Sequence, residues 1–302
     1  MKYRKLLFIL LSGIILTGCS ADTESCSSLP DPDSIIEQEN SSAPEADTEA
    51  ETEAFSENIY YLTRHQKEDS ANLGKFKSHL ETDGFVWNEC EISDIPAEAD
   101  ILIYNFPKED LSSEEYQILK DYTDRGGDFL LFLPASDSEV RYKFLNLFLD
   151  SFSFQIDYDN VTIPEQDAMW VVLQPIGMPD RMTAYDDSMQ TAPVYMQYMR
   201  SFHMLGDYAT DELFIDVMLQ TPEFAVGEPY GGTEDDPLTY ENEKLNILVY
   251  SRDAIRNNAS VIACGANAFL LDENFDSEIS KPAQNWIYSS LFWFCNYDAY
   301  QS

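Results

Sequence analysis

Oxygen-bearing side chains alternate along one acidic stretch near the C-terminus, in a pattern that could bind a cation. Asp272, Asn274, Asp276 and Glu278 are separated by single residues, as the oxygen ligands of calcium loops are. The stretch lacks the central glycine and the distal bidentate glutamate of such loops. A second acidic run lies at 234–236. Because a chain with 55 acidic residues produces such runs by chance, these are weak Ca²⁺ candidates, and we expect no resident metal or cofactor.

One cysteine and three histidines could perform covalent or acid–base chemistry. Cys264 ends an apolar run directly before a glycine, where α/β enzymes often carry nucleophiles, but no local pattern supplies a base. His65 follows the first apolar run of the body and could face a pocket at a strand end, whereas His79 and His203 suit surface and structural roles. The sequence contains no Gly-x-Ser-x-Gly elbow, phosphate-binding loop or zinc-type spacing. We therefore predict no catalytic residues.

The strongest chemical signal is a modification site at Cys19. Lys2, Arg4 and Lys5 precede an apolar run of 11 residues, which is too short to span a bilayer because that requires about 20. The run ends Leu-Thr-Gly-Cys, which looks like a bacterial lipobox. The pattern predicts a lipoprotein signal peptide over 1–18 and a diacylated Cys19 as the first mature residue, with two acyl chains providing stable anchoring.

The segment that follows has the composition of a spacer. Residues 20–58 contain 12 acidic residues and no Lys or Arg, and most of the remainder is Ser, Thr, Ala, Pro and Asn. Such a segment repels itself and has no apolar periodicity to drive packing. We predict a lipidated and disordered acidic tether over 19–58 and a folded body over 59–302, at the extracytoplasmic face of the bacterial cell membrane.

The net charge excludes several functional classes. The chain has 302 residues and a formal charge of −37, from 18 basic and 55 acidic residues. Nucleic acid is excluded as a partner because binding requires Lys and Arg to neutralise phosphates. A polytopic membrane protein is excluded because the one long apolar run lies at the N-terminus. With 44% apolar residues, the body is expected to fold as one large or two modest cores.

Periodicity in the body predicts strands alternating with helices. A helix is expected around 69–81 and another after Ser112, where Ser112-x-x-Glu115 forms a capping box with Leu111 as a hydrophobic staple to Tyr116. A third helix is expected over 142–149, and a fourth over 282–294 with an apolar face that suits the core. Strands are expected at 59–62, 85–90, 100–106, 129–133, 170–173, 194–199, 213–219, 245–250 and 260–264, and an exposed loop at 221–239.

Strand–helix–strand repetition predicts an α/β fold with a mostly parallel sheet flanked by helices. Three cysteines lie in the body, at Cys90, Cys264 and Cys295, and their wide spacing indicates small buried side chains rather than a disulfide framework. One bridged pair remains an alternative in an oxidising compartment.

The order of motifs resembles one known family. Pro107-x-x-Asp110-Leu111-Ser112-x-x-Glu115, placed after a buried strand, is similar to a segment of auxiliary components of ABC-type transport systems, the gliding-motility-type accessory proteins. Further similar segments lie at 119–131, 145–149, 219–222 and 261–273. The resemblance covers roughly 59–296. It implies a Rossmann-like, glutamine-amidotransferase-like body without catalytic residues, which acts beside a transporter permease and ATPase.

The chain departs from that family in its anchor, since a lipid and a tether stand where the family usually carries transmembrane helices. We therefore expect a non-enzymatic extracytoplasmic accessory or binding component of an ABC-type transport system. A solute- or glycan-binding lipoprotein is the main alternative, because Tyr and Trp, 18 and 4 in number, can stack on sugars. A cryptic hydrolase or transferase using Cys264 or His65 is a third.

Overall fold

The computed structural model describes residues 57–65, 72–135, 140–164, 171–175, 189, 193–206, 213–229 and 240–296. All of them belong to one compact unit, Thr52–Ser302. The predicted signal peptide, Cys19 and all but the last two residues of the predicted tether lie outside the described residues, as does the acidic run at 234–236. No helix among the described residues is long and apolar enough to cross a membrane.

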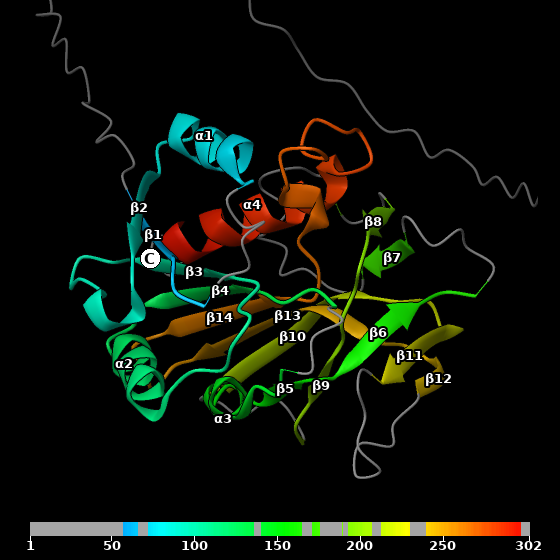
Figure 1. Ribbon diagram of the computed structural model, residues 1–302, viewed down its shortest axis with the longest axis horizontal. Coiled ribbons are helices and arrows are strands. Elements are labelled where there is room, and N and C mark those ends of the chain that lie inside the picture. The colour runs from blue at the N-terminus through cyan, green and yellow to red at the C-terminus, as the bar shows by residue number, and fades with distance from the viewer. Residues whose placement is uncertain are drawn as a thin grey trace, which may run out of the picture. The chain divides into compact units, whose positions relative to one another are not determined.

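The predicted fold class is confirmed by a sheet whose first five strands are parallel and flanked by helices (Figure 1). Their spatial order is β2-β1-β3-β4-β14, with every neighbouring pair parallel. The strands are β1 Asn58–Leu62, β2 Val86–Cys90, β3 Ile101–Asn105, β4 Asp128–Phe132 and β14 Ala259–Cys264. The helices are α1 Gly74–Thr82, α2 Ser113–Asp124, α3 Lys143–Asp150 and α4 Lys281–Asn296, with short 3₁₀ helices η2 Ile92–Asp94 and η5 Ala268–Leu270.

The sheet continues beyond β14 with antiparallel strands. The sequence predicted several of these strands, including 213–219 and 245–250, but not their antiparallel pairing. β13 Asn246–Asp253 pairs antiparallel with β14, because the turn that joins them is too short for a crossover. Asn257 and Asn258 adopt positive φ angles of 50° and 67° in that turn, a conformation that asparagine tolerates. The remaining strands are β10 Leu213–Gln220, β7 Val171–Pro175 and β8 Val194–Met196, with β9 Phe202–Met204 and β5 Phe154–Ile156 branching from β13.

A second sheet corrects one prediction. The stretch 221–239 was expected to be a loop, but β11 Ala225–Pro229 lies within it and pairs antiparallel with β6 Asp159–Thr162 and β12 Tyr240–Glu243. Its Gly and Pro content is typical of loops. Two flanking partners nevertheless satisfy its backbone groups, and this tertiary pairing overrides the local preference.

Alternating side chains of the central strands build two hydrophobic clusters, one on each face. In β4, Leu130 and Phe132 join the cluster that includes α1 and α4, whereas Phe129 and Leu131 join the cluster that includes α2 and α3. The two sets of helices lie on opposite sides of the strands in Figure 1. A strand covered on both faces has apolar side chains at consecutive positions. The apolar run at 129–133 could therefore be predicted as a buried strand from the sequence.

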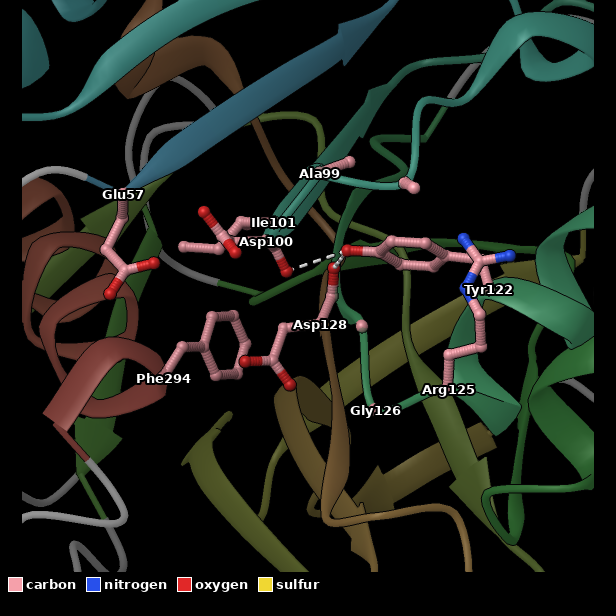
Figure 2. A pocket seen from close by; sticks show the side chains of 11 residues that line it. Glu57, Ala99, Asp100, Ile101, Tyr122, Arg125, Gly126, Asp128 and Phe294 are labelled. Carbon is pink, nitrogen blue, oxygen red and sulfur yellow. Dashed lines mark hydrogen bonds between the residues drawn. The ribbon is translucent and has the colours of Figure 1, made fainter.

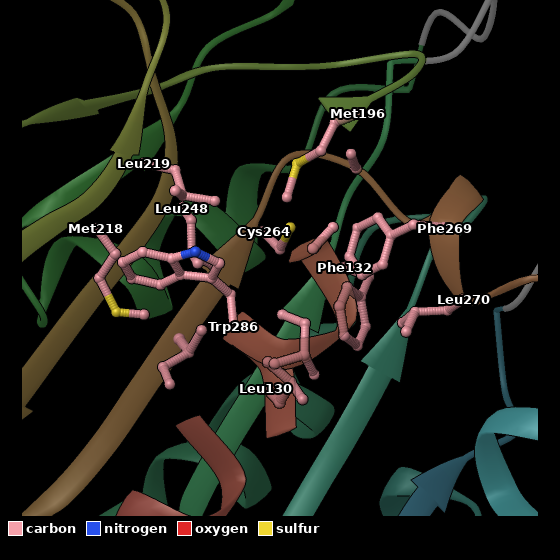
Figure 3. Close-up of a cluster of buried hydrophobic side chains, with 14 of the residues drawn as sticks. Leu130, Phe132, Met196, Met218, Leu219, Leu248, Cys264, Phe269, Leu270 and Trp286 are labelled. Carbon is pink, nitrogen blue, oxygen red and sulfur yellow. The ribbon is translucent and has the colours of Figure 1, made fainter. Parts of the chain in front are cut away.

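The apolar face of α4 is part of the core, as predicted. Trp286 is fully buried and lies among side chains of β10, β13 and β14, including Met218, Leu248 and Cys264 (Figure 3). Its helix neighbours on the same face are also buried: Ala283, Ile287, Leu291 and Phe294. This stripe therefore packs against the sheet.

Candidate functional site

A cavity of about 290 Å³ opens at the edge where the parallel strands begin, which we call the amino edge (Figure 2). The strands β1, β3 and β4 all begin at this edge. Their register pairs Ile59 with Ile101 and Ile101 with Asp128, so the residues at or just before their starts lie close together. The amino-edge pocket is lined by Glu57, Ala97, Ala99, Asp100, Ile101, Tyr122, Arg125, Gly126, Gly127, Asp128 and Phe294.

Two of the carboxyl groups are hydrogen-bonded to each other. The side chain of Glu57 bonds that of Asp100, and burial together with the Asp100 charge raises the pKa of Glu57 to about 7. Asp100 Oδ2 also accepts hydrogen bonds from the backbone and side-chain nitrogens of Asn58, at 2.8 and 3.2 Å. Glu57 therefore keeps its proton up to near neutral pH, because burial and the adjacent Asp100 charge disfavour its ionised form.

The third carboxyl group, that of Asp128, favours its neutral form. Burial raises the pKa of Asp128 to about 8, and the hydrogen bonds from Ser260 and the charge of Arg252 offset this only in part. Ser260 donates its backbone N–H to Asp128 Oδ1 at 2.8 Å. The pocket thus presents carboxyl groups that take up and release protons between about pH 7 and 8.

Tyr122 and the glycine turn after α2 form the opposite wall. The Tyr122 hydroxyl is 2.7 Å from the Asp100 carbonyl oxygen and 2.9 Å from that of Asp128, which ties the starts of β3 and β4 together. A Cβ atom at Gly127 would lie 2.2 Å from the Tyr122 ring, so only glycine fits there. Figure 2 shows Arg125 beside Tyr122, facing Glu57 and Phe294 across the pocket.

The chemistry of the amino-edge pocket is that of a polar binding site. Its lining contains three carboxyl groups and one guanidinium, but no Ser, Thr, Cys, His or Lys among the described residues. It can hold a small solute by hydrogen bonds and charge. It contains no Ser, Thr, Cys or Lys nucleophile, and its carboxyl groups and Tyr122 are the only lining side chains among the described residues of a type that can form covalent intermediates.

The weak metal candidates do not converge on one site. Asp272 accepts a hydrogen bond from Lys75 N at 2.8 Å, and Asn274 donates to the Ala268 carbonyl at 2.9 Å. Asp276 pairs with Lys75, and Glu278 pairs with Lys281 at 2.5 Å. Within the described ranges, no group of three or more His, Cys, Asp or Glu side chains could hold a metal ion.

Cys264 is the last residue of β14 and is completely buried in the apolar cluster shown in Figure 3. Burial raises the pKa of its thiol to about 12, so the reactive thiolate is strongly disfavoured. Cys90 and Cys264 form no disulfide. The Cys295 side chain lies outside the described part of the chain.

The histidines have partners suited to structural roles. His65 lies at the end of the sheet opposite the pocket, which we call the carboxyl edge, with Nε2 3.0 Å from Glu115 and Nδ1 3.3 Å from Glu109. His79 packs 4.5 Å from the Tyr288 ring centroid. His203 Nδ1 is 2.7 Å from Asp157, and this hydrogen bond raises the pKa of His203.

The positions of three acidic residues in the sequence are a signal for the amino-edge pocket that the sequence analysis missed. An acidic residue directly precedes or begins the buried strands β3 and β4, as Asp100 and Asp128, and Glu57 lies just before β1. Acids at the starts of parallel strands must meet at one edge. Tyr122 and Phe294 carry no comparable signal, because helices bring them to the pocket from distant parts of the chain.

Comparison with known proteins establishes the fold and no family. No protein-family model matches the sequence, and no curated protein matches it. The mmIFT52 N-terminal domain is similar in structure, with a TM-score of 0.58 and 15% identity over 78% of this chain and 96% of that one. A ThuA-like protein from Bacteroides uniformis ATCC 8492 gives a TM-score of 0.48 and 16% identity, covering 80% and 91%. At these identities the likeness concerns the fold alone.

Proposed function

We propose that this chain is a non-enzymatic extracytoplasmic lipoprotein that serves as an accessory or binding component of an ABC-type transport system. The lipobox at Cys19 would anchor it to the bacterial cell membrane, and the acidic segment would separate the body from the lipid surface. The transport role is supported by the resemblance of residues 100–115 to auxiliary components of ABC-type transport systems.

One observation carries the non-enzymatic part of the proposal: the chain covers its own carboxyl edge. Ala135 N donates to the Tyr198 carbonyl at 2.7 Å, and Arg200 N donates to the Gly265 carbonyl at 2.9 Å. A Cβ at Gly265 would lie 1.8 Å from the Arg200 carbonyl oxygen, so the two backbones touch. Because α/β enzymes usually assemble their sites at this edge, a covered edge and a buried Cys264 favour binding over catalysis.

The amino-edge pocket lies where the body meets the segment that leads to Cys19. Glu57 both lines the pocket and is the first residue that the structure describes. We propose the amino edge as the face at which a membrane-embedded partner binds. This gives the proposal a direction that can be tested.

Site-specific photo-crosslinking in membranes tests the partner. A crosslinkable residue replacing Arg125, on the exposed rim of the pocket, is expected to capture a permease subunit encoded beside an ABC-type ATPase. The same probe at Tyr198, which is 70% exposed at the carboxyl edge, is the matched control and should not. Cys19→Ala should remain uncleaved or leave the membrane fraction and lose the crosslink. Repeated recovery of the lipoprotein alone, or a Cys19→Ala variant that both fractionates and migrates like the wild type, contradicts the proposal.

The dimensions of the amino-edge pocket favour a second candidate function, that of a solute- or glycan-binding lipoprotein. Its volume of about 290 Å³ suits a small polar molecule. A thermal-shift screen of sugars, amines and amino acids should then find a ligand that stabilises the wild type and not Asp100→Asn. The absence of any stabilising ligand argues against this function.

A further inference from the structure

Arg200 is buried to an extent that is unusual for an arginine. Arg200 is only 2% exposed. It lies between Met199 and Ser201, in the segment that covers the carboxyl edge. The guanidinium carbon lies 5.7 Å from the ring centroid of Tyr142 and 6.0 Å from that of Tyr158. These two rings stack at 6.4 Å with an interplanar angle of 8°, so Arg200 lies against a pair of aromatic side chains.

Two nitrogens of this guanidinium, Nε and Nη1, have no hydrogen-bond partner in the described part of the structure, and Arg200 forms no ion pair there. Arg256 provides the contrast. Its Nε is 3.1 Å from Asp124, and its Nη1 is 3.0 Å from both Asp253 and the Ser151 carbonyl. A buried cation with unsatisfied donors is unfavourable, so an acceptor that bonds Nε and Nη1 of Arg200 would stabilise the folded protein.

The nearby carboxylates do not meet this need. Ser201 donates its hydroxyl within 2.9 Å of Asp157 and 2.7 Å of Asp159, and its backbone N–H to Asp159 at 2.9 Å. His203 occupies the other oxygen of Asp157. Burial raises the pKa of Asp159 to about 6, and the charge of Arg200 offsets that rise only partly. Asp157 and Asp159 therefore hold the covering segment in place and leave Nε and Nη1 of Arg200 without a partner, whereas the guanidinium bonds the Tyr142 side chain.

A second unsatisfied group belongs to a residue that, like Arg200, interacts with Tyr142. The Tyr104 hydroxyl, near the end of β3, is fully buried and has no partner among the described residues. Tyr104 and Arg200 both interact with Tyr142, whose own hydroxyl donates to the Pro107 carbonyl at 2.7 Å. Two residues on the loops around them, Phe106 and Tyr198, adopt positive φ angles of 49° and 52°. Strained backbone of this kind is concentrated at functional sites.

We propose that Arg200 anchors a binding site for a small carboxylate at the carboxyl edge, with Nε, Nη1 and the Tyr104 hydroxyl as donors. Three donors and a buried positive charge select an oxyanion and reject a cation. Arg141, whose guanidinium lies 4.3 Å from the Tyr158 ring centroid, adds a second positive charge. Because the body is strongly acidic, a monovalent anion is favoured over a polyanion. This inference goes beyond the proposed function and does not depend on a transporter partner.

Thermal unfolding of the full chain in Tris chloride tests the site. Formate, acetate and lactate are titrated against sodium chloride at matched ionic strength. At least one should raise the Tm saturably, by about 5 °C or more at about 100 times its Kd. Arg200→Met should abolish this rise. It should also match or exceed the wild-type Tm without carboxylate, because it removes an unpaired buried charge.

Two further variants keep the test decisive. Tyr104→Phe removes only the hydroxyl and should raise the Kd about 3- to 10-fold, with little change in the Tm without ligand.

Arg256→Met is the matched control. It should lower the Tm and retain the carboxylate response, because Arg256 is paired with Asp124 and Asp253 and lies outside the proposed site. No response beyond chloride, or a response that persists in Arg200→Met, overturns the proposal. A loss of Tm in Arg200→Met without any wild-type response identifies a purely structural arginine and also overturns it.

Discussion

At the scale of single residues, the amino-edge pocket depends on carboxyl groups that are partly buried. Asp128 and Glu57 have pKa values of about 8 and 7, and burial is the largest cause for both. A carboxyl group that is hard to ionise in the folded protein makes folding depend on pH. The titration of the pocket is therefore measurable as stability, whatever the pocket binds.

Asp128→Asn is expected to flatten the pH dependence of the unfolding free energy. The folded-state pKa of about 8 lies above the ordinary value of 3.8, so the folded protein holds a proton that the unfolded chain releases between these values. The stabilising contribution is complete below about pH 4 and is lost as pH rises to 8, by at most about 1.4 kcal/mol per pH unit. Urea unfolding from pH 5 to 8 measures the slope.

The asparagine keeps the oxygen that accepts from Ser260, so the variant should fold. It should lose less stability than the wild type as pH rises, with a residual slope from Glu57. Asp121→Asn, on the exposed face of α2, is the control and should behave as the wild type. Equal slopes in Asp128→Asn and the wild type would show that Asp128 does not hold a proton in this range.

At the scale of elements, the helices differ in where their N-terminal caps come from. α2 carries its own capping box, in which Ser112 Oγ accepts from Glu115 N and Glu115 accepts from Ser112 N. α1 is capped from a distance by Asp272, and α3 by Asp110, whose carboxylate accepts from Phe144 N and Leu145 N at 2.8 and 3.1 Å. Only the first of these caps can be recognised from neighbouring residues.

Ser112→Ala should lower the unfolding free energy by about 1 kcal/mol, because the first turn of α2 loses one side-chain acceptor. Glu115 also contacts His65, so Ser112 is the cleaner position for this test. Ser113→Ala changes the next residue, which is exposed and is not the cap, and should have little effect. Chemical denaturation of the two variants compares them directly. Equal losses in both would mean that the capping box does not stabilise the helix.

At the scale of the whole molecule, the negative charge belongs to the folded body as much as to the N-terminal segment. From residue 59 onward there are 43 acidic residues against 15 basic ones. The described ion pairs engage only some of these acids, and several pairs are largely exposed, such as Lys281 with Glu278. The body therefore repels itself, which favours solubility and opposes compactness.

Salt is expected to stabilise the body. Raising NaCl from about 0.05 M to about 0.5 M screens the repulsion between surface carboxylates more than it weakens the few exposed ion pairs. The urea midpoint should rise monotonically, with an unchanged slope of the transition. Urea titrations at several NaCl concentrations measure this, and sucrose of equal osmolality is the control for nonspecific exclusion. A falling midpoint would mean that the ion pairs matter more than the net repulsion.

Local pattern was sufficient for the parallel half of the sheet and the four helices. Strands covered on both faces, such as 129–133, are continuous apolar runs, and helices such as α2 carry their start and stop signals within a few residues. The resemblance at 100–115 led to the same α/β fold. The lipidated Cys19, the tether and the transport role stay predictions, because they concern residues and partners outside the described structure.

The sequence by itself determined which segments are buried on both sides and where the helices begin. Only the tertiary structure decided the antiparallel half, the small sheet of β6, β11 and β12, and the two polar sites. Short strands such as β5 and β9 form only because a partner from a distant segment satisfies their backbone groups. The amino-edge pocket and the surroundings of the buried Arg200 arise in the same way. Strand register and chain crossing, which no local pattern encodes, bring their residues together.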